Sequence, residues 1–505
     1  MATPGAHHRP IFRAALVGLS VWAISAPAWG PAGCASTEGR LGTSVSDDPL
    51  VVARDREASI QQRLKAIDQA WADVQAGRAD RAATRESLKS IIWTHQPTPV
   101  RLRVLDVYLS DTTEEGIADT RNLFRLRLPT ESDWKVIEAI GAAAAARGWT
   151  EITPALVRSY ARPVPQPADP DRPERRALEA LHPGVSVEET VFRVFVEASA
   201  ASDEASAKVR RDAWELLARL DADGSRRRDL LAAASEEPHA DDALQALRAA
   251  ATDLRCIPVT GSEFEWLLQL REQTAWWAET SAAVRTLSDE QVRGLCLRHL
   301  EPIRWAAAAR PQWLAADRQT LLDELASRLK GRRLHERDAE AGSSFGNRRE
   351  RLRENADRLV WGDVLTILVI DEALHDPRVI AAFMTQVVED RRDTSTEHGG
   401  ILEWAAASGF RAVHYPPRAT QRINDRTFIA SDDMFRASAL ALAHYHFHVQ
   451  DVRNGAYAGP GPGDVEYADK HNRNCIVITS IDERILNADY YQRGGAVIDL
   501  GELGR

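Results

Sequence analysis

Hydrophobic positions in the first two thirds of the chain recur at steps of three and four residues. Such spacing places apolar side chains on one face of an α-helix. It is clearest at Ile60, Leu64, Ile67, Trp71 and Val74, and it returns in three later groups: Val209, Ala213, Leu216, Leu217 and Leu220; Ala243, Leu244 and Leu247; Leu321, Leu322, Leu325 and Leu329. Because no run here alternates as a strand does, we predict an α-helical region over residues 50–330.

The predicted helices are short and are separated by Pro, Gly and Asp turns, which favours stacked helical hairpins. The arrangement loosely resembles HEAT-like arrays. It has no fixed repeat period, so a solenoid and an irregular helical bundle are both open. Residues 162–173 are too rich in proline for a helix and predict an extended connector within this region.

The pattern changes after residue 330. Residues 331–354 carry charges of both signs, which indicates a solvated linker or, alternatively, a basic binding patch. Beyond it, runs of β-branched and apolar residues alternate with helical segments, so residues 355–505 predict an α/β domain with a mixed sheet. Strands are expected at residues 410–415, 426–430, 440–450, 474–479 and 496–500, and residues 364–370 fit either a strand or a buried helix.

Three histidines alternate with aromatic residues along the strand predicted at residues 440–450. Successive strand side chains point to opposite faces, so His444, His446 and His448 share one face. Same-face neighbours lie roughly 6.8 Å apart along a strand, which is close enough for two imidazoles to bind one metal ion. Such a site also needs an oxygen or sulfur ligand. The alternative is a polar strand face without a metal.

Two carboxylates are candidates to complete the site. Asp464 follows a Gly/Pro loop and stands at the start of a predicted helix, either as a ligand or as the helix N-cap. Glu397 lies upstream, between a helix predicted from residues 379–388 and a Glu-x-Gly-Gly passage into a strand.

This order of elements resembles the JAMM (MPN+/JAB) metallopeptidase family, whose pattern is an upstream Glu, then His-x-His, then a Ser followed by an Asp. The resemblance is confined to residues 355–505. It implies that Glu397 is the catalytic glutamate and that His446, His448 and Asp464 bind zinc (Zn²⁺). The implied reaction is hydrolysis of a peptide or isopeptide bond in a peptide or protein substrate.

The chain departs from this family at the glycine-rich loop. The loop is longer than the family's, with sixteen positions from His448 to Asp464, and the expected Ser falls on Gly461. Losing an oxyanion donor costs on the order of 10²–10³ in rate, unless a loop N–H replaces it. The alternative function is therefore a weak or inactive metal-binding domain on an α-helical envelope scaffold, with a protein partner on the helices. His444 is expected to orient a ligand or to act as an alternative third ligand.

The N-terminus predicts export. Residues 1–33 have a basic start and an apolar core too short for a membrane span, typical of a signal peptide. Residues 31–36 resemble a bacterial lipobox that would leave Cys34 lipidated, followed by a polar tether over residues 34–49. The expected product is a lipoprotein facing the periplasm, with the lipid as its membrane contact. Cleavage after Ala28 would instead give a soluble periplasmic or secreted protein.

Composition narrows the remaining choices. The chain has 505 residues and a formal net charge of −10, which argues against a nucleic-acid surface. Apart from Cys34 there are three cysteines and no Cys-x-x-Cys pair, so buried free thiols are expected, with a Cys256–Cys296 bridge as the alternative. His398, His414 and His471 are single in the sequence and are expected on the surface or beside the site.

Overall fold

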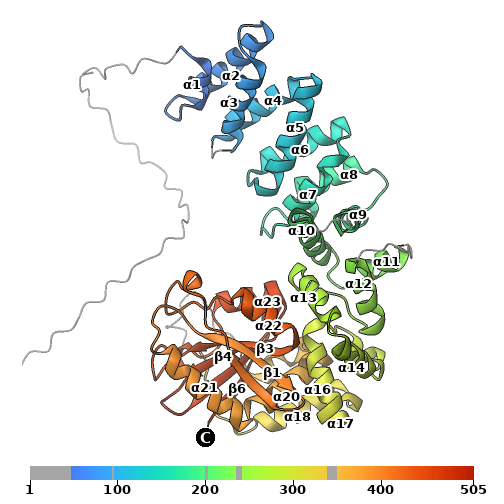
Figure 1. The fold of residues 1–505 in the computed structure, drawn as a ribbon, viewed down its shortest axis with the longest axis vertical. Helices are drawn as coiled ribbons and strands as arrows, with labels where there is room; N and C mark the ends of the chain where they lie inside the picture. Colours follow the sequence, from blue (N-terminus) through green and yellow to red (C-terminus); the bar gives the residue numbers. More distant parts are fainter. Residues whose placement is uncertain (1–46, 94–95, 200–202, 235–241, 338–349, 505) are drawn as a thin grey trace, which may run out of the picture.

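The computed structural model describes residues 47–93, 96–199, 203–234, 242–337 and 350–504. It shows a helical array followed by a C-terminal body built on a six-stranded mixed sheet, which confirms the predicted fold class (Figure 1). The signal peptide, Cys34 and the tether up to residue 46 lie outside the described residues. Within the described ranges, no helix is long and apolar enough to cross a membrane.

The array consists of helices that follow one another in chain order, from α1 at one end of the molecule to α18 beside the sheet (Figure 1). Extensive contacts join near neighbours such as α2 with α4, α9 with α10 and α10 with α13, as in a solenoid. The helices are α1 (Pro49–Arg54), α2 (Ile60–Gln75), α3 (Arg81–Trp93), α4 (Thr98–Ser110), α5 (Glu114–Arg127), α6 (Trp134–Arg147), α7 (Thr153–Ala161), α8 (Pro173–Leu181), α9 (Val187–Ser199), α10 (Glu204–Leu220), α11 (Ser225–Ala233), α12 (Asp242–Asp253), α13 (Gly261–Arg271), α14 (Thr274–Arg285), α15 (Asp289–Val292), α16 (Leu300–Ala309), α17 (Pro311–Ala315) and α18 (Arg318–Leu329).

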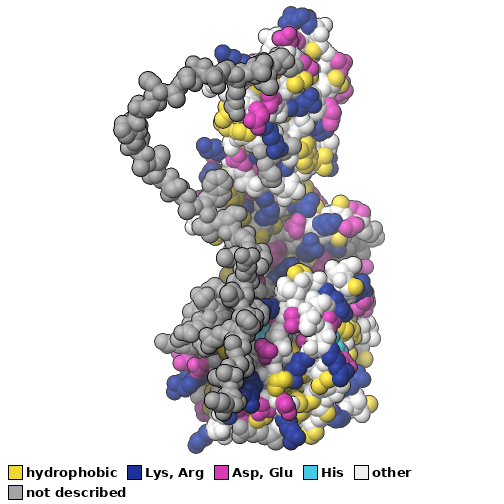
Figure 2. All heavy atoms as spheres, turned by 90° about the vertical axis from the view of Figure 1, so that its left-hand side faces the viewer, with side chains coloured by type: hydrophobic (Ala, Val, Ile, Leu, Met, Phe, Trp, Pro, Cys, Tyr) yellow, Lys and Arg dark blue, Asp and Glu magenta, His cyan; other side chains and the backbone are white. Residues whose placement is uncertain are grey.

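The apolar spacing in the sequence explains how these helices pack. Helix α2 starts after Ser59, whose side chain accepts the N–H of Gln62, and it buries Ile67, Trp71 and Val74. On the face seen in Figure 2, positive and negative side chains are interspersed over the array. The array therefore buries its apolar stripes between neighbouring helices and exposes a mixed-charge surface.

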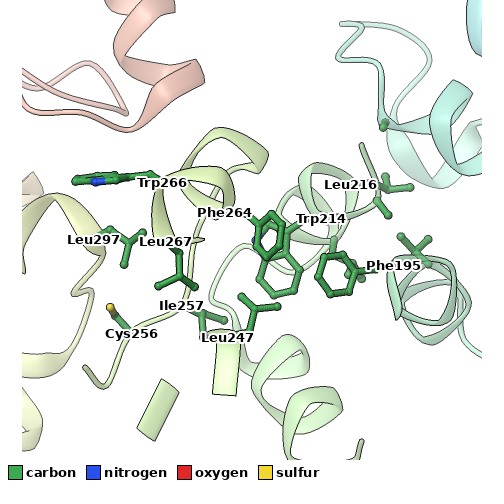
Figure 3. Packing of buried hydrophobic residues seen from close by; sticks show 14 of the residues in the cluster. Phe195, Trp214, Leu216, Leu247, Cys256, Ile257, Phe264, Trp266, Leu267 and Leu297 are labelled. Carbon is green, nitrogen blue, oxygen red and sulfur yellow. The ribbon is translucent and has the colours of Figure 1, made fainter. Parts of the chain in front are cut away.

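One hydrophobic core continues from the array into the sheet body. Figure 3 shows Phe195 and Trp214 packed near Phe264 of α13, with further apolar side chains leading toward Leu297. Trp266 Nε1 of α13 donates a hydrogen bond of 2.8 Å to the carbonyl oxygen of Ala439. Helices α16 and α18 pack on α20, so the last helices of the array adjoin the body directly. The domain boundary at residues 331–354 stays a prediction.

The sheet has the strand order β2-β1-β3-β4-β5-β6, and β3 pairs with β4 in parallel while the other neighbouring pairs are antiparallel. A parallel pair needs a crossover connection, which here contains α23. The strands are β1 (Gly399–Ala405), β2 (Gly409–His414), β3 (Ala441–His448), β4 (Cys475–Ser480), β5 (Leu486–Tyr491) and β6 (Val497–Leu503).

The strand predictions are confirmed for β1, β2, β3, β4 and β6, and wrong at residues 426–430. That segment forms no strand; its apolar side chains instead pack beside the histidine strand, where Phe428 stacks on the ring of His446. Strand β5 was not predicted, because its buried residues include Asn487 and Asp489, which interrupt the apolar pattern.

Helices cover both faces of the sheet. Helices α20 (Trp361–Leu374) and α21 (Pro377–Asp390) lie on one face. Helices α22 (Asp432–Ala437) and α23 (Pro462–His471) lie on the other face. The four-residue helix α19 (Leu352–Asn355) contacts β6. Helix α20 is buried on nearly all sides, so its apolar run has no helical period. Residues 364–370 are therefore helix, the second of the two readings.

Candidate metal centre

The three histidines of β3 lie in the interior of the sheet. Every residue of β3 is buried, and His444, His446 and His448 line one cavity. Phe447, between them, packs with Phe383 of α21 on the opposite face. The alternation along the strand therefore separates an aromatic core from a row of imidazoles.

The imidazoles of His446 and His448 face each other, with 3.3 Å between their Nε2 atoms. His448 Nδ1 lies 3.0 Å from the carbonyl oxygen of Tyr457 and donates its hydrogen there, so the Nε2 lone pair points toward His446. Two nitrogen ligands at about 2.0–2.1 Å from a tetrahedral ion lie roughly 3.3 Å apart. The pair therefore has the spacing of two ligands of one metal ion.

Asp464 approaches the same two nitrogens. Its Oδ1 lies 3.3 Å from His446 Nε2, and its Oδ2 lies 3.7 Å from His448 Nε2. Burial by itself would raise the pKa of Asp464, but the two histidines and the Gly461 N–H, 2.6 Å from Oδ2, outweigh it and lower the pKa. Asp464 is the third residue of α23, which begins at Pro462. It presents an ionised carboxylate to the imidazole pair.

Glu397 stands directly ahead of β1. Burial raises its pKa to about 8; the carboxylates of Asp464 and Asp390 add to the rise and His446 opposes it. Its Oε1 accepts a hydrogen bond of 2.7 Å from Gln450 Nε2. The ligand atoms of Glu397, His446 and His448 lie within 4.8 Å of one another. This buried group could hold a metal ion.

Glycines allow β1 to bring Glu397 to this position. A Cβ on Gly399 would collide with the carbonyl oxygen of Tyr445, and one on Gly400 with that of Val413. Both glycines sit where β1 is squeezed between β2 and β3, so the Glu-x-Gly-Gly pattern reflects close backbone approach.

A cavity of about 510 Å³ opens onto the imidazole pair, within the size range of small-ligand sites. Its lining is Arg337, Glu397, Arg426, Thr427, Phe428, His444, Tyr445, His446, His448, Gln450, Asp451, Asn454, Tyr457, Gly461, Pro462, Gly463, Asp464, Tyr467 and Tyr491. All the residues predicted for the site therefore line one cavity, apart from Cys34. No sequence pattern pointed to Arg337, Gln450 or Tyr457: Arg337 is far from the histidines in the chain, Gln450 acts through Glu397, and Tyr457 acts through its backbone carbonyl.

His444 lies one same-face step from the pair. Its Nδ1 is 2.7 Å from the Tyr467 hydroxyl, and its buried Nε2 has no hydrogen-bond partner in the described part of the chain. Burial lowers its pKa well below the usual range. A neutral imidazole here can support the site without adding charge.

The glycine-rich loop is already hydrogen-bonded at two amides. The N–H of Gly461 donates to Asp464, and that of Gly459 donates to Asp489 Oδ2 over 3.1 Å. Both act in holding the loop, so neither replaces the missing Ser hydroxyl in this arrangement. A side chain at Gly461 would fit, because its φ is −76° and an added Cβ would meet only Asp464 Oδ2 at 3.4 Å.

His398 and His414 are not single, as the sequence suggested, because the β1–β2 hairpin brings them together. His414 Nε2 lies 3.1 Å from His398 Nδ1, and their outer nitrogens face Glu389 and Asp393. His471 instead reaches Ser262 of α13 at 2.8 Å. Because His398 and His414 are sixteen residues apart, their contact could not be predicted from local sequence patterns.

The three described cysteines, Cys256, Cys296 and Cys475, are buried and free, as expected. The alternative Cys256–Cys296 bridge is not formed.

Comparison with known protein families, with curated proteins and with solved structures finds no match to this chain.

Proposed function

We propose that the chain is a zinc-dependent hydrolase resembling the JAMM peptidases, which cleaves a peptide or isopeptide bond. The observation that carries this proposal is the meeting of four groups in one cavity: two imidazole nitrogens 3.3 Å apart, an ionised Asp464 beside them, and a buried Glu397. Imidazole nitrogen and carboxylate oxygen are donors that zinc prefers in hydrolytic sites.

His446 Nε2, His448 Nε2 and Asp464 would hold the zinc ion. When bound, zinc supplies a Lewis acid that polarises a carbonyl and brings the pKa of a water molecule toward about 7. Tyr457 supports this site through its carbonyl oxygen, which fixes the ring of His448 and leaves Nε2 free to bind.

Glu397 would move the proton. Its carboxylate accepts a proton from the attacking water at one Oε atom and delivers it to the leaving amine. A carboxyl pKa raised to about 8 by burial suits this exchange near neutral pH, and Gln450 holds Oε1 in place. The JAMM resemblance supplies the choice of a peptide or isopeptide bond.

A second candidate function follows from Gly461, which stands where the family has Ser. Without that hydroxyl, the body would bind metal and turn over weakly or not at all. The chain would then act as a scaffold whose helical array binds a protein partner.

Metal analysis of the purified chain, combined with hydrolysis of a peptide library, tests the proposal. We expect about one zinc per chain, strongly reduced in His446→Ala and in Asp464→Ala. His375→Ala, which removes an exposed imidazole outside the cavity, is the matched control. Zinc without hydrolysis favours the scaffold; zinc content unchanged in His446→Ala contradicts both candidates.

Export and lipid anchoring are part of the same proposal. They rest on the basic and apolar N-terminal segment and on Cys34. Cys34→Ser should release the protein from the membrane fraction into the soluble periplasm. An unchanged distribution would favour cleavage after Ala28.

A further inference from the structure

The cavity that holds the imidazole pair also contains two arginines without an ion-pair partner. Arg337 and Arg426 both line it, and within the described ranges neither lies within ion-pair distance of a carboxylate. Neighbouring arginines on the same loop differ: Arg418 pairs with Asp433, and Arg422 lies 2.7 Å from Asp393. Arg426, by contrast, lines the cavity and forms no ion pair with a described residue.

Arg337 is held in place by the glycine-rich loop. Its Nη2 donates to the carbonyl oxygen of Gly459 over 2.8 Å and lies 3.4 Å from that of Tyr457. The same Tyr457 oxygen accepts the Nδ1–H of His448. Arg337 Nε is buried and has no partner in the described part of the chain. A partly buried guanidinium is therefore fixed beside one imidazole with hydrogen-bonding capacity left over.

Arg426 belongs to a different segment of the cavity lining. It is exposed and precedes Thr427 and Phe428, and the Phe428 ring stacks on His446 at 5.9 Å between centroids. The two guanidiniums thus belong to segments that contact different histidines: one segment shares a carbonyl with His448, and the other covers His446.

The remaining charges of the lining do not neutralise these arginines. Glu397 and Asp464 face the imidazole pair. Asp425, next to Arg426 in the chain, interacts with it electrostatically but does not line the cavity, and neither Asp425 nor Asp451 lies within ion-pair distance of Arg337 or Arg426. A guanidinium recognises a carboxylate through charge-assisted, often bidentate hydrogen bonds. We propose that Arg337 and Arg426 bind a carboxylate of the substrate next to the bond to be cleaved.

This inference rests on the proposed hydrolase function and names its substrate class: peptides with a carboxylate beside the scissile bond. The carboxylate can be an acidic side chain or a free C-terminus, since both present the same group to a guanidinium. The neutral wall made by Phe428 and Tyr491 leaves the rest of the cavity to apolar or backbone parts of the peptide.

Three acetylated peptides test it: tetra-alanine amide, the same peptide with a free C-terminal carboxylate, and an amide with glutamate in place of one alanine. Binding is measured by calorimetry to the zinc-loaded Glu397→Gln chain, which leaves peptides intact. We expect at least one carboxylate peptide to bind about tenfold or more tightly than the neutral amide, since hydrogen bonds between two charged groups are stronger than those between neutral groups. If the peptide with the free C-terminus binds more tightly, the recognised group is a C-terminal carboxylate; if the glutamate peptide does, it is an acidic side chain.

Arginine variants of the Glu397→Gln chain show which residue causes the preference for carboxylate peptides. Arg426→Gln should remove most of the preference without affecting binding of the neutral peptide, and Arg337→Gln should do the same. Because Arg337 also holds the loop, Arg337→Lys provides a second variant that keeps the charge and part of the preference. Arg453→Gln, an exposed arginine nearby that does not line the cavity, is the matched control.

The outcomes separate this inference from the proposed function. Equal binding of neutral and acidic peptides, no binding of any, or an equal loss in Arg453→Gln overturns it. In the wild type, hydrolysis of neutral and acidic peptides at equal kcat/KM supports the hydrolase and contradicts the carboxylate preference. Preferential binding without any hydrolysis supports the preference and overturns the hydrolase.

Discussion

Glu131 in the helical array and Glu397 ahead of β1 are both buried glutamates, but their surroundings act on them in opposite directions. Burial alone would raise the pKa of Glu131, yet the Asp133 N–H and the guanidiniums of Arg101 and Arg127 outweigh it and lower the pKa. Glu397 forms no ion pair with an arginine of the described residues, and its pKa rises to about 8. Glu131 is therefore an ionised carboxylate paired with arginines, whereas Glu397 is a carboxyl group that can hold or release a proton near neutral pH.

The same contrast holds more widely. From α1 to α12, the buried carboxylates are matched by buried arginines: Asp111 by Arg85 at 3.1 Å, Glu174 by Arg172 at 2.9 Å, Asp221 by Arg227 at 3.1 Å. Glu263 of α13, beside the sheet body, differs: it accepts backbone N–H groups instead, and burial raises its pKa. In the sheet body, Asp464 meets two imidazoles and Asp489 is buried with another acid, Asp499, nearby.

Matched buried charges specify packing, whereas unmatched ones are typical of functional sites. From α1 to α12, the array thus has the charge arrangement of a structural scaffold. The sheet body concentrates the groups whose protonation or metal binding can change.

The largest effect is expected at Glu397. Glu397→Gln keeps the size of the side chain but loses the proton acceptor, so hydrolysis should fall by about 10²–10⁴ while zinc content stays normal. Turnover and metal analysis on the same sample check this. Glu403→Gln, on the exposed end of β1 and paired with Arg411, is the control. A normal rate in Glu397→Gln would sink the assignment of Glu397 as the base.

Removing Glu131, the carboxylate paired with buried arginines, should instead lower the stability of the fold. Glu131→Ala leaves the buried Arg127 without this partner and leaves Arg101 with Asp133 at 3.8 Å, and breaking a buried ion pair typically costs about 3–5 kcal/mol. Denaturant unfolding measures it, and zinc content of the folded chain should not change. Glu138→Ala removes an exposed partner of Arg176 and should cost less than about 1 kcal/mol. If Glu131→Ala lowers zinc content, the array is not merely a scaffold for the site.

Gly461→Ser tests whether the site lacks only an oxyanion donor. The backbone at Gly461 accepts a side chain, as its φ and open surroundings show. A hydroxyl there should raise the rate of peptide hydrolysis by about 10²–10³ on an intact zinc site. Gly461→Ala adds the Cβ without the hydroxyl and should change little. No gain in Gly461→Ser would favour the scaffold function.

The smallest expected effect is at the second acidic pair. Burial raises the pKa of Asp489 well above its usual range and that of Asp499 to about 6. A raised carboxyl pKa contributes stability below the unfolded-state pKa of about 3.9, and this contribution is lost as pH rises toward the folded pKa. Between pH 4 and 6, the unfolding free energy should therefore decline with pH.

Asp489→Asn removes one of the two acidic side chains with a raised pKa. The decline of the unfolding free energy between pH 4 and 6 should therefore become less steep, by up to about 1.4 kcal/mol per pH unit. Unfolding curves at pH 4, 5 and 6 measure the slope. Glu466→Gln, which removes a negative charge from the exposed face of α23, is the control. Equal slopes in wild type and Asp489→Asn would show that Asp489 is not protonated in the folded chain.

Much of the architecture follows from local sequence. Steps of three and four fixed the helices α2, α10, α12 and α18, because one apolar face suffices to bury a surface helix. Alternation placed three histidines on one face of β3, since the strand period is two. The convergence of Glu397 and Asp464 on that face was foreseen by resemblance to a known pattern.

Tertiary structure alone decided the rest. Residues 364–370 form a helix that is buried on nearly every side, and residues 426–428 line the cavity, where Phe428 stacks on His446. Arg337 reaches the site from more than a hundred positions upstream of His448. The pKa of Glu397 depends on its burial and on the nearby carboxylates of Asp464 and Asp390, conditions that arise only once distant segments pack together.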